Sequence, residues 1–123
     1  FYGAQAEQFS FYRIPKALFT EPNFRELSTD AKVLYGILLD RMSLSLKNQW
    51  LDAQNKVYII FTVEEIMDAL NCANQKATRL MVELEKQAGL IERKRQGLGR
   101  PNLIYVKNFA ATINDKSCEK GDS

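Results

Sequence analysis

The sequence predicts an α+β fold, and three observations within residues 62–106 support this prediction. First, Thr62 and Glu65 have the spacing of a capping box, in which a hydroxyl and a carboxylate reciprocally satisfy backbone N–H groups at a helix start. Second, a turn and a longer helix with a polar leading end follow. Third, two β-prone runs joined by a Gly- and Pro-containing connection indicate a hairpin. This order of elements is typical of a winged helix-turn-helix.

Apolar spacing predicts the buried faces of both helices. In the first helix the apolar residues that recur at helical spacing are Val63, Ile66, Met67 and Leu70. The second helix is expected from near Gln75 to Ala88, because Gly89 stands where a left-handed C-terminal cap requires it. Its expected inward positions are Ala77, Leu80, Met81, Leu84 and Ala88. Its expected outward positions are Gln75, Arg79, Val82 and Lys86.

The outward side of the second helix is polar and cationic near its N-terminal end, the part of a recognition helix that enters the major groove. Arg79 has the donors for a bidentate contact with guanine, and Gln75 or Asn74 has the groups that pair with adenine. Lys76 and Thr78 are expected to contact phosphates. An ordinary solvated surface is the alternative, but the position after a turn and before a basic hairpin favours DNA. The candidate DNA-binding residues of this helix are Asn74, Gln75, Lys76, Thr78 and Arg79.

The predicted hairpin, or wing, is also basic. Its arms are residues 90–96 and 102–106, and its candidate DNA-binding residues are Lys94, Arg95, Gln96, Arg100 and Asn102. Since side chains alternate along a strand, Arg93, Lys94 and Arg95 cannot all share one face, and at least one should point away from DNA. The alternative for this run is a charged edge strand that discourages aggregation.

Positive charge is concentrated on the second helix and the wing. The whole chain carries a net charge of only +2. Residues 73–108, however, contain eight Lys and Arg against three Glu, for a net charge of +5, whereas residues 1–72 carry −2 and the last fifteen residues −1. This distribution is the electrostatic pattern expected of a nucleic-acid-binding surface.

Composition argues against several other classes of protein. The 123 residues suit one domain, and the 46% hydrophobic and 26% charged content is ordinary for a globular protein. No signal peptide or membrane-spanning run is recognisable, so a cytoplasmic location is expected. Cys72 and Cys118 lie far apart without metal-ligand spacing, and histidine is absent. We therefore expect no metal, no cofactor and no enzymatic activity, with Cys72 a small buried residue.

Aromatic residues are concentrated between residues 9 and 27, before the longest predicted helix. Pro15 suits the first turn of a short helix that continues through Phe19. A domain of this size would hardly leave so many rings in water, so they either complete the core or face a second subunit. Both interpretations remain open here. The candidate self-association residues are Phe9, Phe11 and Tyr12.

The longest helix is expected from Thr29 to Leu46, with caps available at residues 28–30. Its apolar residues cover more than half its circumference, so it is expected at the centre of the domain or in an interface. Residues 49–60 are expected to form a second hairpin whose latter arm pairs with the wing. Residues 1–8 are read as a frayed start, and residues 110–123 as a linker or disordered tail after a domain of residues 1–109.

Several of these segments resemble the N-terminal domain of RepA-type plasmid replication initiators of Gram-positive bacteria. The resemblance covers about residues 9–109 and rests on residues 11–16, 27–28, 50–52, 58–62, 97–102 and 104–106, of which Gly97-Leu98-Gly99-Arg100-Pro101 is the most specific. It implies a self-associating winged-helix domain that binds repeated origin sites called iterons. It also implies a C-terminal domain, absent here, that recruits host replication proteins. Where the family often has Gly between Trp50 and Tyr58, this chain has Ala53, Gln54 and Asn55.

The sequence thus favours a non-enzymatic, sequence-specific binder of double-stranded origin DNA that acts as a homodimer. Two alternatives share the fold, because fold alone does not define function. One is a winged helix used for protein assembly in a primosome-like complex. The other is a transcriptional repressor, with the same chemistry directed at a promoter.

Overall fold

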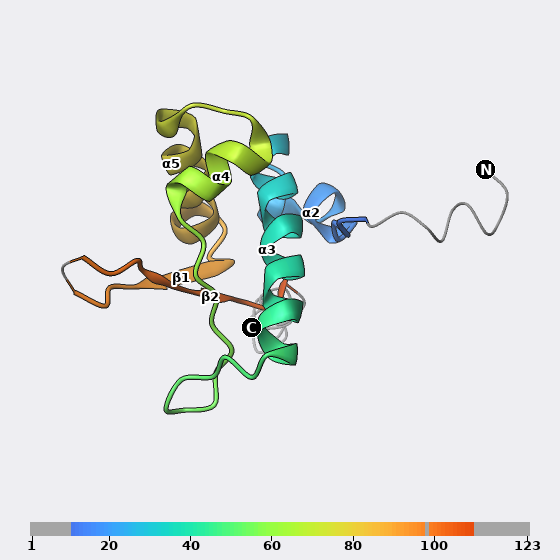
Figure 1. Ribbon diagram of the computed structural model, residues 1–123. Helices are drawn as coiled ribbons and strands as arrows, with labels where there is room; N and C mark the ends of the chain where they lie inside the picture. Colours follow the sequence, from blue (N-terminus) through green and yellow to red (C-terminus); the bar gives the residue numbers. More distant parts are fainter. Residues whose placement is uncertain (1–10, 98, 110–123) are drawn as a thin grey trace, which may run out of the picture.

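The computed structural model describes residues 11–97 and 99–109. The predicted frayed start, Phe9 and the predicted tail at 110–123 lie outside the described residues. The elements in chain order are α2 (Ala17–Thr20), the 3-10 helix η1 (Pro22–Phe24), α3 (Thr29–Lys47), α4 (Val63–Leu70), α5 (Asn74–Val82), the π-helical turn η2 (Glu83–Gln87), β1 (Ile91–Lys94) and β2 (Leu103–Val106). In the view of Figure 1, α4 and α5 lie on one side of α3, and the β1–β2 hairpin projects from that same side. The predicted α+β winged helix-turn-helix is confirmed.

Helix α3 is the centre of the core, as its apolar circumference predicted. Its N-cap is Ser28, whose hydroxyl accepts the backbone N–H of Ala31 at 3.2 Å. Its buried apolar residues are Ala31, Leu34, Tyr35, Ile37 and Leu38. The hydroxyl of Tyr35 donates to the carbonyl of Lys107 at 2.6 Å, which fixes the end of the hairpin against α3. Burial raises the pKa of Tyr35 to about 12, although a hydrogen bond with the backbone of Phe109 acts in the opposite direction.

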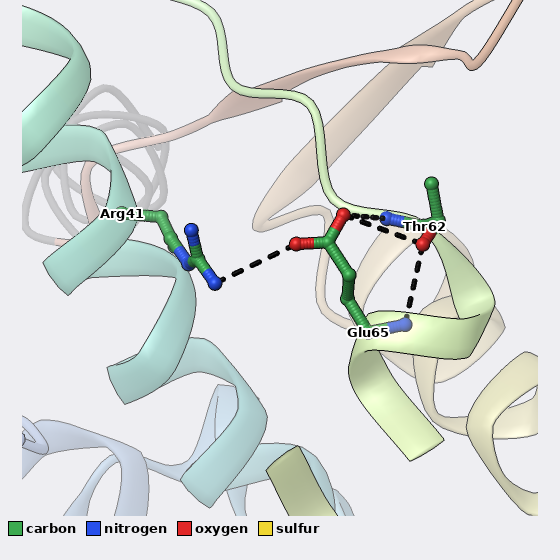
Figure 2. Close-up of polar contacts among 3 residues, drawn as sticks. All are labelled: Arg41, Thr62 and Glu65. Carbon is green, nitrogen blue, oxygen red and sulfur yellow. Dashed lines mark hydrogen bonds and ion pairs between the residues drawn. The ribbon is translucent and has the colours of Figure 1, made fainter. Parts of the chain in front are cut away.

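Helix α4 begins with the predicted capping box. The backbone N–H of Glu65 donates to the Thr62 hydroxyl at 3.2 Å, and the Glu65 carboxylate accepts the Thr62 N–H at 3.3 Å. Figure 2 shows that the other carboxylate oxygen of Glu65 faces Arg41 of α3, at 3.5 Å from its guanidinium. The Arg41 guanidinium also lies over the Phe61 ring, 5.0 Å from its centre. One carboxylate therefore both caps α4 and holds it against α3.

Helix α5 begins one residue earlier than predicted and changes geometry before it ends. Its inward positions Ala77, Leu80 and Met81, and Leu84 of η2, are buried as expected. From Glu83 onward the helix is π-helical instead of regular, with the Ala88 N–H donating to the Glu83 carbonyl at 3.1 Å. Gly89 then adopts a positive φ of 65°, as its predicted capping role requires.

The hairpin is antiparallel, with Ile91 opposite Val106 and Lys94 opposite Leu103. The second hairpin expected at residues 49–60 is reduced to two isolated bridges, Leu51 with Val57 and Ile59 with Ile104. Ile59 exchanges both backbone hydrogen bonds with Ile104, each 2.9 Å, so the expected pairing with the wing is confirmed at this one position.

The Asp52 side chain adds hydrogen bonds to the loop before Ile59, where the backbone N–H of Asp52 also donates to the Lys56 carbonyl at 3.0 Å. The Asp52 carboxylate accepts the backbone N–H groups of Lys56 at 2.9 Å and Gln54 at 2.8 Å, and the Tyr105 hydroxyl at 3.0 Å. The Lys56 N–H is the largest of the effects that lower the pKa of Asp52. Asn55 adopts the left-handed conformation, with φ of 65°, which asparagine tolerates better than most residues other than glycine.

The aromatic segment contains both buried and exposed rings. Phe24 is fully buried and completes the core. Phe11 and Tyr12 instead are 70% and 57% exposed, and Phe19 lies beside Lys32, with the ammonium 4.5 Å from the ring centre. Core completion is therefore the wrong interpretation for Phe11 and Tyr12. None of the helices in the described ranges combines the length and hydropathy that crossing a bilayer requires.

Candidate nucleic-acid interface

Four polar residues at the start of α5 form one exposed surface, which we call the recognition face. Its members are Asn74, Gln75, Thr78 and Arg79. Their spacing places them on adjacent turns of one side of the helix, opposite the buried Ala77, Leu80 and Met81. Within residues 11–97 and 99–109, no side-chain hydrogen bond or ion pair occupies the Gln75 amide or the Arg79 guanidinium. These donors are therefore available to a ligand.

Lys76 does not belong to the recognition face in the way the sequence suggested. Its ammonium lies 2.6 Å from the Asp30 carboxylate in the first turn of α3. Lys76 is thus turned toward the flank of α5, although its side chain is still 42% exposed. A phosphate contact by Lys76 requires that it leave Asp30.

The cations of the hairpin are distributed over its two faces, as strand alternation predicted. Ile91 and Arg93 of β1 are the less exposed residues, and Glu92 and Lys94 are exposed. The Arg93 guanidinium donates twice to one Glu85 oxygen, at 2.6 and 3.1 Å. Arg93 is therefore held within the protein, whereas Lys94 faces the opposite side of the hairpin.

Two hollows confirm this division. One, of about 250 Å³, lies between the hairpin and the start of α4, and its polar lining includes Arg93, Arg100, Asn102 and Thr62. The other, of about 440 Å³, lies on the opposite side of the hairpin, where Lys94 is close to Lys56, Lys107 and Asp52. The structure thus places Arg100 and Asn102 toward α4 and α5 but does not bring Lys94 to them.

The remaining wing candidates have different surroundings. Arg95 is exposed. Gln96 donates its side-chain amide to the Pro101 carbonyl at 2.8 Å and so closes the base of the hairpin loop. Gly97 and Gly99 have φ values of 123° and 76°, which explains why glycine occupies both turn positions.

Three acidic residues that bear on this interface were not identified as such from the sequence. They are Asp30, Glu83 and Glu85, which bond to Lys76, Ser28 and Arg93 respectively. From the sequence alone, Asp30 is a candidate helix cap, and the two glutamates are charges that offset the local excess of cations. No local spacing marks such pairs, because tertiary packing decides which partners meet.

An exposed polar face at the start of α5, beside a protruding hairpin, defines a winged helix-turn-helix domain with a recognition helix. The chain belongs to the family described as the replication initiator protein A (RepA) N-terminus, whose model matches residues 10–120. The predicted resemblance is therefore confirmed.

Individual relatives agree with this assignment. The chain is 32% identical over 103 residues to a "41 kDa protein" of Lactobacillus helveticus, and the match covers 84% of this chain but only 28% of that relative. Three solved structures are similar. One is an N-terminal domain of a DNA-binding protein, with 36% identity, a TM-score of 0.75, and coverage of 100% of this chain and 95% of that one. The second is a Rep–DNA complex, with 35% identity, a TM-score of 0.73, and coverage of 100% of this chain and 96% of that one. The third is an MDR initiator, with 38% identity, a TM-score of 0.70, and coverage of 95% of this chain and 97% of that one.

Proposed function

We propose that this domain binds the double-stranded DNA of a plasmid replication origin in a sequence-specific manner. The observation that supports this most strongly is the recognition face, whose side-chain donors have no partner among the described residues, in a chain 35% identical over its full length to one in a Rep–DNA complex. The repeated sites would be iterons. The domain would act in the cytoplasm and would catalyse no reaction itself.

In this proposal α5 enters the major groove and the hairpin contacts the adjacent backbone. Arg79 would donate to a guanine edge, and Gln75 or Asn74 would pair with adenine. Thr78, Arg95 and Arg100 supply phosphate contacts, which fix the register but do not read the sequence. Asn102 lies beside Arg100 in the same hollow and is an additional candidate.

The proposed partners extend beyond DNA. Phe11 and Tyr12 are large exposed rings, which supports a homodimer formed through this segment, with Phe9 as a third candidate. Since the chain spans 28% of the length of its Lactobacillus relative, recruitment of host replication proteins would fall to another part of a longer protein.

The experiment is a fluorescence anisotropy titration with a duplex that contains the plasmid's origin repeats and a scrambled duplex of the same composition, each at several salt concentrations. The repeat duplex should bind more tightly. If about four to six phosphates are neutralised, the logarithm of affinity should fall against the logarithm of salt concentration with a slope of about −4 to −5. Equal binding of the two duplexes would overturn sequence-specific recognition.

The exposed rings also favour a second candidate, a module for protein assembly. In that case Arg79→Glu would leave plasmid replication intact, while Phe11→Ser with Tyr12→Ser would abolish it. The DNA-binding proposal expects Arg79→Glu to abolish both origin binding and replication. A repressor would instead bind a promoter duplex in preference to the origin repeats.

A further inference from the structure

The π-helical turn η2 connects α5 to the hairpin, and both of its glutamates bond to other elements. Glu83 accepts the backbone N–H of Ser28 at 2.9 Å and the Ser28 hydroxyl at 3.0 Å, at the start of α3. Glu85 accepts two hydrogen bonds from Arg93 of β1. One acid therefore fixes the end of α5 to the central helix, and the other fixes the hairpin to the end of α5.

The Arg93–Glu85 contact is better shielded than the other ion pairs near the interface. The two side chains are 27% and 20% exposed, compared with 42% and 49% for Lys76 and Asp30. Charge-assisted hydrogen bonds between shielded, planar groups are stronger and more directional than contacts of flexible surface chains. The pair can therefore set an orientation as well as add stability.

The loop at the free end of the hairpin carries Arg100, the proposed contact with the DNA backbone. Its base is fixed by the Lys107 N–H, which donates to the Leu90 carbonyl at 2.8 Å, and by the bridge between Ile59 and Ile104. Arg93 lies partway along β1, and Arg100 lies beyond the strands in the loop. A small tilt near Arg93 consequently moves Arg100 by more.

We propose that Glu85 and Arg93 are a positioning pair, which sets the angle of the hairpin relative to α5 so that Arg100 meets the DNA backbone while α5 is in the groove. This inference rests on the proposed function. It assigns a role inside the protein to Arg93, one of the three hairpin cations that strand alternation kept from sharing one face.

The test is a thermodynamic cycle measured by anisotropy on the origin-repeat duplex. Glu85→Gln with Arg93→Gln removes the pair without altering the net charge, so general electrostatic attraction to DNA is unchanged. We expect affinity to fall by about three- to tenfold, similar to the effect of Arg100→Ala alone. When all three changes are combined, the loss should be no greater than for removal of the pair alone, because Arg100 no longer meets the backbone once the hairpin is displaced.

Arg25→Gln with Glu26→Gln is the matched control, since both residues are exposed, oppositely charged and outside the interface. It should leave affinity unchanged. Glu85→Asp, which keeps the charge but shortens the reach, is the second variant in case the double substitution unfolds the domain. Its smaller loss should likewise combine with that of Arg100→Ala to less than the sum of the two.

The inference would be overturned if removal of the pair cost the same affinity with and without Arg100→Ala. It would also be overturned if removal of the pair, or Arg100→Ala alone, left affinity normal. Those outcomes differ from failure of the proposed function itself. In that case the unaltered domain would bind the repeat and scrambled duplexes equally.

Discussion

Arg79 and Arg93 carry the same guanidinium group within one cationic stretch, yet the structure uses them in opposite ways. Arg79 is exposed on α5 and has no side-chain partner within the described ranges, whereas Arg93 on β1 donates twice to Glu85. The net charge of +5 on residues 73–108 therefore overstates the number of cations available to a ligand. Exposure and the absence of an internal partner, more than charge alone, distinguish a candidate contact from a structural one.

The largest effect on binding is expected from Arg79→Ala. Loss of a bidentate base contact should weaken binding to the origin-repeat duplex by about 1–3 kcal/mol, or roughly 5- to 150-fold. The scrambled duplex should be much less affected, which a parallel anisotropy titration measures. Lys86→Ala, also exposed but at the far end of the same helical segment, is the control. An equal loss on both duplexes would mean that Arg79 contacts only the backbone.

Arg93→Ala, unlike Arg79→Ala, should also lower the stability of the folded domain. It leaves the half-buried Glu85 carboxylate without its partner, so the free energy of unfolding should fall by about 1–3 kcal/mol at neutral pH. Arg79→Ala should change the free energy of unfolding by less than about 0.5 kcal/mol, since the Arg79 side chain is exposed. Urea denaturation of the two variants measures this contrast. Equal stability of both variants would remove the distinction between the two arginines.

Acid should abolish the stability difference that Arg93→Ala creates. The hydrogen bonds from Arg93 are the main cause of a pKa of Glu85 below its ordinary value of 4.5. A carboxyl with a lower pKa in the folded state stabilises the fold above its unfolded pKa, and that contribution is lost as pH falls through the folded pKa. The difference in free energy of unfolding between the unaltered domain and the Arg93→Ala variant should thus be largest at pH 6–7 and shrink below about pH 4.5. A gap that is constant from about pH 7 to 3 would contradict this account.

The smallest effect is expected at Asp30, which holds Lys76 beside the recognition face. Asp30→Asn should release this cation and raise DNA affinity by up to about fivefold, because exposed ion pairs contribute about 0–1 kcal/mol. The slope of the logarithm of affinity against the logarithm of salt concentration should become more negative by about 0.9 if Lys76 then contacts one more phosphate. Asp40→Asn, exposed on the same helix, controls for net charge. The gain should disappear in a Lys76→Gln background, and its persistence there would exclude Lys76 as the cause.

Local sequence patterns predicted local structure well. The Thr62–Glu65 capping box, the left-handed Gly89 and the inward residues of α5 all depend on neighbours within a few positions, where spacing alone is informative. The exposed positions of Gln75 and Arg79 followed from the same periodicity. The fold class could therefore be inferred before the structure.

Features that depend on distant partners could not be predicted. Nothing near Lys76 in the sequence indicates that Asp30 will pair with it, and nothing in residues 83–87 indicates a π turn. Residues 49–60 had the composition of a hairpin, but they form isolated bridges instead of strands, and the Asp52 carboxylate accepts the backbone N–H groups of Gln54 and Lys56. The Phe11–Tyr12 pair and Phe24 are similar in composition, and only packing separated exposed rings from a buried one.

The contact between Tyr35 and Lys107 also has a mechanical consequence. The backbone of Lys107 is held at both its carbonyl, by a buried phenol, and its N–H, by Leu90. These two hydrogen bonds tie the end of β2 to α3 and to the residue that precedes β1. The base of the hairpin is therefore anchored to the central helix at the end opposite the loop that carries Arg100.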